Sequence, residues 1–148
     1  MRCVVQRVKK AHVKVENITI GKIEKGLLIF VGFEPSDDIN DQNWMINKLI
    51  NMRIFDDDNG KMNLSVSDIE GQLLVVSQFT LHASTKKGNR PSFIKADKPE
   101  SAEKKYDDFV LALSKQLEIE TGKFGAMMNV SLENDGPVTI IIDSKNKE

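Results

Sequence analysis

The apolar run Leu73-Leu74-Val75-Val76 constrains the fold most, because it indicates a deeply buried strand. The segment Ser77-Gln78-Phe79-Thr80-Leu81 follows it and brings polar side chains to the strand end. Serine, glutamine and threonine rarely end a core strand unless their polar groups have hydrogen-bond partners. These side chains therefore either satisfy nearby backbone groups or belong to a functional site.

A second segment, Asn134-Asp135-Gly136-Pro137-Val138-Thr139, places a Gly-Pro pair just before another apolar strand. Glycine permits unusual backbone angles, while proline fixes φ, removes an N–H and can hold a cis bond. A plain turn is the alternative, since most X–Pro bonds are trans. Together the two segments indicate a pocket built largely from main chain, with few ionisable groups.

Alternating apolar residues predict strands over residues 2–8 and 11–15, and an apolar run predicts another over 27–31. The turn residues between these runs predict a meander of short antiparallel strands. Strands return near residues 128–132 and 138–142. The strand pattern therefore predicts a mostly antiparallel sheet.

Two main helices are predicted. The first covers about residues 38–52, after a group of N-cap residues. The second begins near Asp97, with Pro99 and then Glu100 at capping-box spacing. Its apolar face comprises Tyr106, Phe109, Val110, Leu113 and Leu117. The fold class is therefore α+β, a mostly antiparallel sheet with a barrel-like core and two helices.

At 148 residues the chain has the size of one ordinary domain, and we expect residues 1–148 to form a single one. No apolar run approaches the ~20 residues of a membrane span, and no secretory signal is visible. Cys3 is the only cysteine, which excludes an internal disulfide and a cysteine-based zinc cluster. We therefore expect a cytoplasmic protein with no membrane partner.

The formal net charge of −1 argues against a protein that grips long stretches of nucleic acid, because such proteins carry a strong basic excess. Any nucleic-acid contact must come from a local patch or a small footprint. The best candidate patch is Lys86, Lys87 and Arg90, directly after the first polar segment. The alternative is a solvated, glycine-containing turn.

Neither a metal nor another cofactor is expected. The segment Asp56-Asp57-Asp58-Asn59-Gly60 resembles a calcium loop in composition, but Phe55 and Val66 would occupy its first and twelfth ligand positions. A metal centre needs three or four clustered ligands, and His12 and His82 are far apart in sequence. A surface turn is the favoured interpretation of the acidic segment.

Thr80 is the candidate nucleophile for covalent catalysis. If the strand continued past Ser77, then Gln78, Thr80 and His82 would share one face, with alternate residues roughly 6.5–7 Å apart. That spacing is too long for a direct bond between Thr80 and His82. No carboxylate between Leu73 and Asp97 could orient the histidine. A Thr–His pair is therefore not favoured.

The chain resembles the D-aminoacyl-tRNA deacylases, whose two hallmark motifs, SQFTL and NxGPVT, both stand unaltered here. The similarity covers almost the whole length. It includes Gln6-Arg7-Val8, Arg53-Ile54-Phe55, Gly60-Lys61-Met62-Asn63-Leu64, Arg90-Pro91-Ser92-Phe93 and Thr121-Gly122-Lys123-Phe124.

This resemblance implies hydrolysis of the ester that joins a D-amino acid to the 3′ end of tRNA. It places backbone oxyanion donors around Phe79 and Thr80, in the segment that also holds Ser77 and Gln78. No Asp, Glu or Cys lies in either motif core except Asp135, which stands at a position where the family pattern is variable. Assistance by the ribose 2′-OH fits such a pocket.

The resemblance also implies a chiral wall, Gly136-Pro137 with a cis bond, that one protomer of a homodimer donates to its partner's pocket. Arg7 would help to hold it. The wall rejects L side chains by steric overlap, so glycine should still be accepted. Lys86, Lys87 and Arg90 would contact the acceptor end of the tRNA.

Two other classes of function stay open from the residues alone. One is a non-catalytic module that binds the 3′ end of tRNA. The other is an esterase or peptidase that acts on small D-amino-acid substrates.

Overall fold

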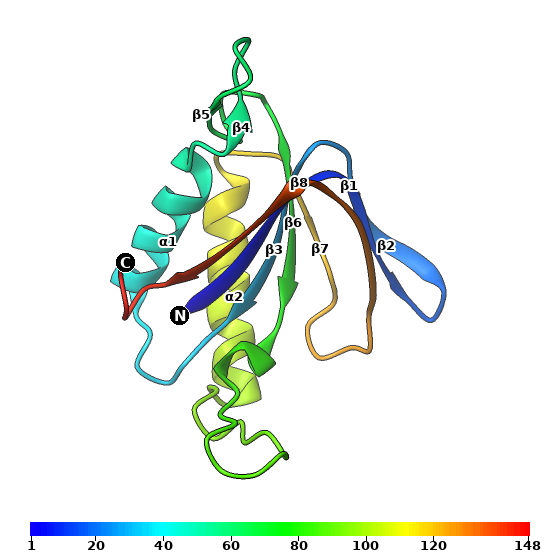
Figure 1. The fold of residues 1–148 in the computed structure, drawn as a ribbon. Helices are drawn as coiled ribbons and strands as arrows, with labels where there is room; N and C mark the ends of the chain where they lie inside the picture. The colour runs from blue at the N-terminus through cyan, green and yellow to red at the C-terminus, as the bar shows by residue number, and fades with distance from the viewer.

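The computed structural model describes all of residues 1–148 (Figure 1). The strands are β1 (Arg2–Val15), β2 (Ile18–Ile23), β3 (Gly26–Gly32), β4 (Phe55–Asp56), β5 (Met62–Leu64), β6 (Gln72–Ser77), β7 (Ile119–Thr121) and β8 (Asn129–Asp143). The helices are α1 (Ile39–Asn51), the 3-10 helix η1 (Phe79–His82) and α2 (Pro99–Ser114). Both long helices lie on the same side of the main sheet (Figure 1). No helix is long and apolar enough to cross a membrane.

The main sheet is mixed: three of its strand pairs are antiparallel, in agreement with the expected mostly antiparallel sheet, and two are parallel. β1 pairs antiparallel with β3 through its first half and with β2 through its second half. It also pairs with β8 along most of its length. The pairs β3–β6 and β6–β7 are parallel. Each parallel pair is joined by a crossover that contains a helix, α1 in the first and α2 in the second, as parallel strands require.

The sheet curls until its two ends almost meet, which confirms the expected barrel-like core. A Cβ atom at Gly21 of β2 would lie 2.5 Å from the carbonyl oxygen of Thr121 of β7, so the two strands touch backbone to backbone. Only glycine permits this approach. The curled sheet encloses a small apolar cluster of Val8, Ala11, Val13, Ile23, Leu28, Leu74 and Val76.

A larger apolar core lies between the other face of the sheet and the two helices. Helix α1 follows the sequence expectation: Asp38 is its N-cap, and Asp38 and Asp41 form a reciprocal capping box. Helix α2 does not. Its N-cap is Lys98, without a side-chain cap, because the Asp97 carboxylate instead accepts hydrogen bonds from Ser101 and Lys105. Its buried face includes Tyr106, Phe109 and Leu113, as predicted.

Candidate active site

The polar segment after β6 does not continue as a strand. The N–H of Gln78 donates to the carbonyl of Val31 at 2.7 Å, and the chain then turns into η1. The side-chain amide of Gln78 donates to Oγ1 of Thr80 at 2.5 Å. Thr80 is exposed, whereas His82 is buried, so the two side chains do not share one face and no hydrogen bond joins them. The two side chains are separated because residues 79–82 form a 3-10 helix, in which side chains do not alternate between two faces as they do in a strand.

Ser77, Gln78 and Phe79 line a cavity of about 620 Å³. Its walls are mainly apolar and carry Phe33, Phe79, Phe93, Phe124, Met127 and Met128. The rings of Phe79 and Phe93 pack edge to face, with centroids 5.2 Å apart. Phe79 is 57% exposed even so, which leaves aromatic surface free at the cavity mouth.

Asp97 is the one charged residue in the cavity lining. Burial alone would raise the pKa of its carboxyl, but hydrogen bonds from Lys105 and Ser101 and the backbone N–H of Lys98 lower it below the ordinary value. The Lys105 ammonium lies 2.7 Å from Asp97. A paired carboxylate with a lowered pKa is a weak base, so the cavity contains no free general base.

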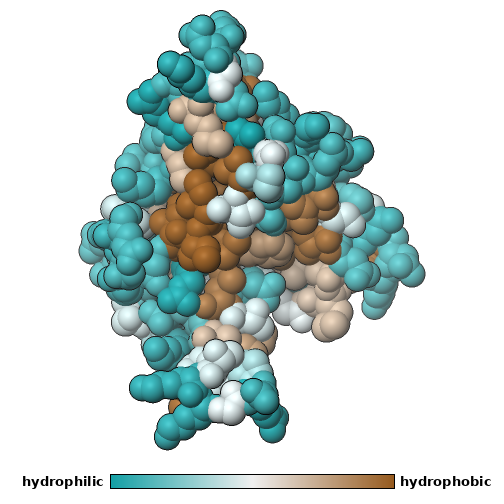
Figure 2. Space-filling view, in the orientation of Figure 1, coloured by the Kyte–Doolittle hydropathy of each residue, from teal (hydrophilic) through white to brown (hydrophobic).

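Thr80 lies outside this cavity and lines a second, more open groove of about 1140 Å³. The groove also contains Val4 of β1, Leu81, and Ile141 of β8, which is 70% exposed. Figure 2 shows an apolar area over the part of the face where β8 crosses the sheet. An exposed apolar surface beside a polar strand end is typical of an interaction site.

The Gly136–Pro137 peptide bond is cis, as predicted. Both residues are exposed at the bend of β8, and Gly136 has a φ of 143°. The Asn134 side chain brackets the pair: its oxygen accepts the N–H of Val138 at 2.8 Å. Gly136 and Pro137 do not line either of the two cavities described above.

Arg7 holds the bend of β8 in place through hydrogen bonds to the backbone. Its guanidinium is buried and donates to the carbonyls of Ile54 at 2.6 Å and Asp135 at 2.8 Å. Asp56 and the Asp135 carboxylate lie 3.4 and 3.7 Å from it and balance its charge. Arg7 therefore fixes the carbonyl immediately before Gly136.

The basic patch lies on an exposed loop between η1 and α2. Ser84 and Ser92 pair across the base of this loop, and Lys86, Lys87 and Arg90 lie beyond them without an ion-pair partner. Phe93, at the end of the same loop, lines the cavity. The structure thus brings the basic loop next to the cavity mouth.

Sequence reasoning missed Glu34, whose carboxylate oxygen lies 3.3 Å from Nδ1 of His82. Glu34 lies far from residues 73–97 in the sequence, but it follows β3, the strand beside β6. The aromatic cavity walls were missed as well. No group of three or more His, Cys, Asp or Glu is placed to hold a metal ion.

A comparison with known proteins shows to which family the chain is similar. The profile of the family described as D-Tyr-tRNA(Tyr) deacylase matches residues 4–143. Curated proteins named D-aminoacyl-tRNA deacylase are 60% identical in Flavobacterium psychrophilum, with both chains fully covered, and 55% identical in Thermosipho africanus, with 98% of each covered.

Two solved structures share the fold. One, described as a c-Myc DNA unwinding element binding protein, has a TM-score of 0.92 and 41% identity over 97% of this chain and 98% of its own. The other, a probable eukaryotic D-amino acid tRNA deacylase, has a TM-score of 0.81 at 18% identity over 95% and 97%. From the family profile and its full-length relatives, the chain belongs to the D-aminoacyl-tRNA deacylase family, hydrolases that act on aminoacyl-tRNA.

Proposed function

We propose that this deacylase removes D-amino acids from the terminal adenosine of tRNA in the cytoplasm, with the terminal nucleoside in the cavity beside Ser77–Phe79. The aromatic cavity next to the polar strand end is the observation that carries the proposal. Its volume of about 620 Å³ suits a small ligand, and its phenylalanines offer faces and edges on which a base can stack.

The ester carbonyl would lie at the start of η1. The first N–H groups of a helical turn have no partner within that turn, so those of Phe79 and Thr80 can stabilise a developing oxyanion. The side-chain amide of Gln78 donates a hydrogen bond to Oγ1 of Thr80, which orients the turn. In this role the Thr80 hydroxyl does not act as a nucleophile. Water is then the attacking group.

Activation of that water falls to the substrate. The Asp97 carboxylate accepts a hydrogen bond from the Lys105 ammonium, and Thr80 has no basic side chain as a partner. The ribose 2′-OH lies next to the ester and can both donate and accept a hydrogen bond. Because the cavity contains no free general base, we infer that the 2′-OH positions or activates the water.

Selection against L-amino acids would come from the chiral wall, Gly136-Pro137. Because the wall is exposed and does not line the cavity of its own chain, we infer that it completes the pocket of a second copy. The apolar groove beside Thr80 is the surface on which that copy would sit. A two-fold dimer would give each protomer one donated wall.

Hydrolysis of D-, L- and glycyl-tRNA by the wild-type protein tests this function. Rapid release of D-amino acids and glycine is expected, because neither places a side chain against the wall, and L-alanyl-tRNA should be resistant. Rapid L-aminoacyl hydrolysis would refute the wall, and failure on glycyl-tRNA would show that the pocket binds the side chain.

The same assay separates the other classes. Binding of charged tRNA without turnover would indicate a non-catalytic module. Equal turnover of D-amino esters that lack a ribose would indicate a small-substrate esterase.

A further inference from the structure

We propose that His82 and Glu34 form a brace that sets the position of η1, so that His82 is a positioning residue for the deacylation reaction. The inference rests on the proposed function of η1 as the site of the oxyanion donors. It concerns a histidine that lies just outside the SQFTL motif.

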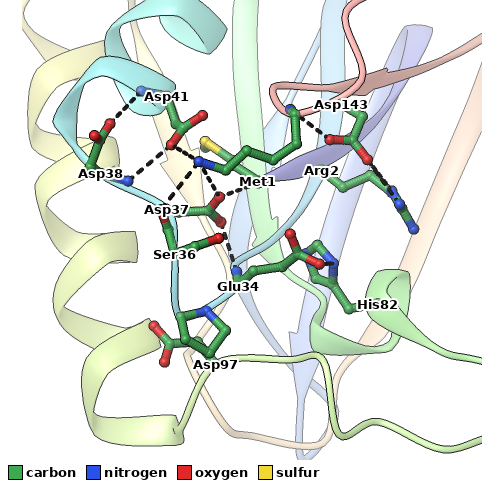
Figure 3. Close-up of polar contacts among 12 residues, drawn as sticks. Met1, Arg2, Glu34, Ser36, Asp37, Asp38, Asp41, His82, Asp97 and Asp143 are labelled. Carbon is green, nitrogen blue, oxygen red and sulfur yellow. Dashed lines mark hydrogen bonds and ion pairs between the residues drawn. The ribbon is translucent and has the colours of Figure 1, made fainter.

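His82 is an unusual buried group. It is 3% exposed, and neither ring nitrogen makes a hydrogen bond. Buried polar atoms without partners are rare and costly. Figure 3 shows the Glu34 carboxylate against the His82 ring, where the loop after β3 meets η1. At 3.3 Å from Nδ1, this carboxylate is the group that can satisfy the ring.

Steric contacts fix the ring on its other side. A Cβ atom at Gly32 would lie 3.0 Å from Cδ2 and 3.3 Å from Nε2 of His82, and 2.7 Å from the carbonyl oxygen of Gln78. The ring of His82 therefore packs directly on the backbone of β3. Glycine at position 32 makes this contact possible.

The brace joins two walls of the cavity. Gly32 and Phe33 line it from β3, and Gln78 and Phe79 line it from the segment after β6. Glu34 follows the first pair and His82 follows the second. A change in the Glu34–His82 contact would shift Phe79 and Thr80 relative to β3, and hence the oxyanion donors relative to the bound ester.

Other charged groups near η1 are already paired. Arg2 of β1 donates to the carbonyl of Leu81 at 2.7 Å and pairs with Asp143 of β8 at 2.8 Å. Lys105 of α2 reaches the backbone carbonyl of Glu34 at 2.9 Å and the carboxylate of Asp97. Glu34 is thus the charged side chain in contact with the His82 ring.

The experiment compares His82→Ala, His82→Asn, Glu34→Gln and the His82→Ala/Glu34→Gln double variant, with His12→Ala as the matched control. Deacylation kinetics on D-aminoacyl-tRNA are measured together with amide hydrogen exchange of residues 78–83 in the free protein. His82→Ala should lower kcat about 10- to 100-fold, the scale of a misplaced reacting group, with KM within two-fold. His82→Asn, which keeps a nitrogen near Nδ1, should recover part of the loss.

The double variant should lose no more activity than His82→Ala alone, because the two residues act as one unit. Exchange in residues 78–83 should accelerate in His82→Ala and in Glu34→Gln, and not in His12→Ala. An unchanged kcat, additive losses, or unchanged exchange would overturn the brace. If His82→Ala does not fold, Glu34→Gln decides by the same readouts.

The exchange measurement needs no substrate, so it tests the brace even if the wild type does not hydrolyse D-aminoacyl-tRNA. In that case the proposed function fails by itself. Normal wild-type turnover with unaltered exchange and kcat in Glu34→Gln would refute the brace and leave the proposed function intact.

Discussion

Gly136 illustrates at the residue scale how backbone conformation limits substitution. Its φ of 143° disfavours any L side chain, and a Cβ atom there would lie 2.8 Å from Cγ2 and 2.9 Å from the backbone nitrogen of Val138, and 3.3 Å from the guanidinium of Arg7. Backbone cannot yield as a flexible side chain does. The segment itself would have to move.

We therefore expect Gly136→Ala to reduce hydrolysis of D-aminoacyl- and glycyl-tRNA alike, by at least about tenfold in kcat/KM. Gly60→Ala is the matched control, because Gly60 also has a positive φ but has open space around it. Steady-state kinetics of both variants decide the point. Normal activity of Gly136→Ala would show that this segment does not shape the pocket.

Thr80 carries the second prediction at this scale. Thr80→Val removes the hydroxyl but keeps the shape and the backbone N–H. If only the N–H acts, activity should stay within about tenfold of wild type, whereas loss of a true nucleophile costs several orders of magnitude. Single-turnover rates, with Thr85→Val as an exposed control, measure the effect. An acyl-enzyme trapped on Thr80 would contradict the water mechanism.

At the scale of elements, α1 shows which structure is predictable from neighbouring residues. Its cap depends on Asp38 and Asp41, three positions apart, so the sequence predicts its start correctly. The capping box expected at the start of α2 is wrong, because the Asp97 carboxylate accepts hydrogen bonds from Ser101 and from Lys105, two turns along the helix. Likewise, the strands expected over 128–132 and 138–142 are one strand, since pairing with β1 carries β8 through the Gly-Pro bend.

The α1 cap gives a pH-dependent prediction. Burial alone would raise the pKa of the Asp41 carboxyl, but hydrogen bonds from Lys145 and the backbone N–H of Asp38 lower it well below its ordinary value (Figure 3 shows the cap). A carboxyl whose pKa is lowered on folding stabilises the protein above its unfolded pKa of about 3.9 and loses this effect as the pH falls.

Asp41→Asn should therefore lower the free energy of unfolding by a constant amount between about pH 5 and 7, and the difference should shrink below about pH 4. Urea unfolding at several pH values measures it. Asp58→Asn, on the exposed β4–β5 hairpin, is the control and should change little. A difference that persists unchanged at low pH would show that charge at Asp41 is not the cause.

The loop between η1 and α2 carries a prediction about tRNA binding. Replacing Lys86, Lys87 and Arg90 by alanine should weaken binding and lower the slope of log K against log salt by roughly 0.7–0.9 for each lost phosphate contact. The preference for D over L should not change. The same substitution of Lys9, Lys10 and Lys22, exposed on β1 and β2, controls for net charge. An unchanged slope would reduce the patch to a solvated turn.

At the scale of the whole molecule, long-range pairing marks the limit of prediction from sequence. The parallel pairs β3–β6 and β6–β7 depend on where two helices return the chain, which strand periodicity does not encode. The same pairing brings Glu34 to His82 across 48 positions of sequence. The sequence predicts the two motifs as site segments, whereas the aromatic cavity beside the first motif is formed by four separate parts of the chain.

We propose that each active site is built from two chains, with the chiral wall donated by the partner. Mixing two variants, each impaired in a different part of the site, tests it most directly. Gly136→Ala disables the wall, and Ala126→Trp fills the cavity with an indole ring, since Ala126 lies in its lining. The variants are unfolded together and refolded at equal amounts, then assayed on D-aminoacyl-tRNA.

If the wall is donated in trans, about half of the dimers are mixed, and each mixed dimer contains one intact cavity facing one intact wall. The mixture should then recover about a quarter of wild-type activity, while either variant refolded alone should keep about a tenth or less. A mixture as inactive as its separate components would show that the wall serves its own chain, or no site at all, and would contradict the account.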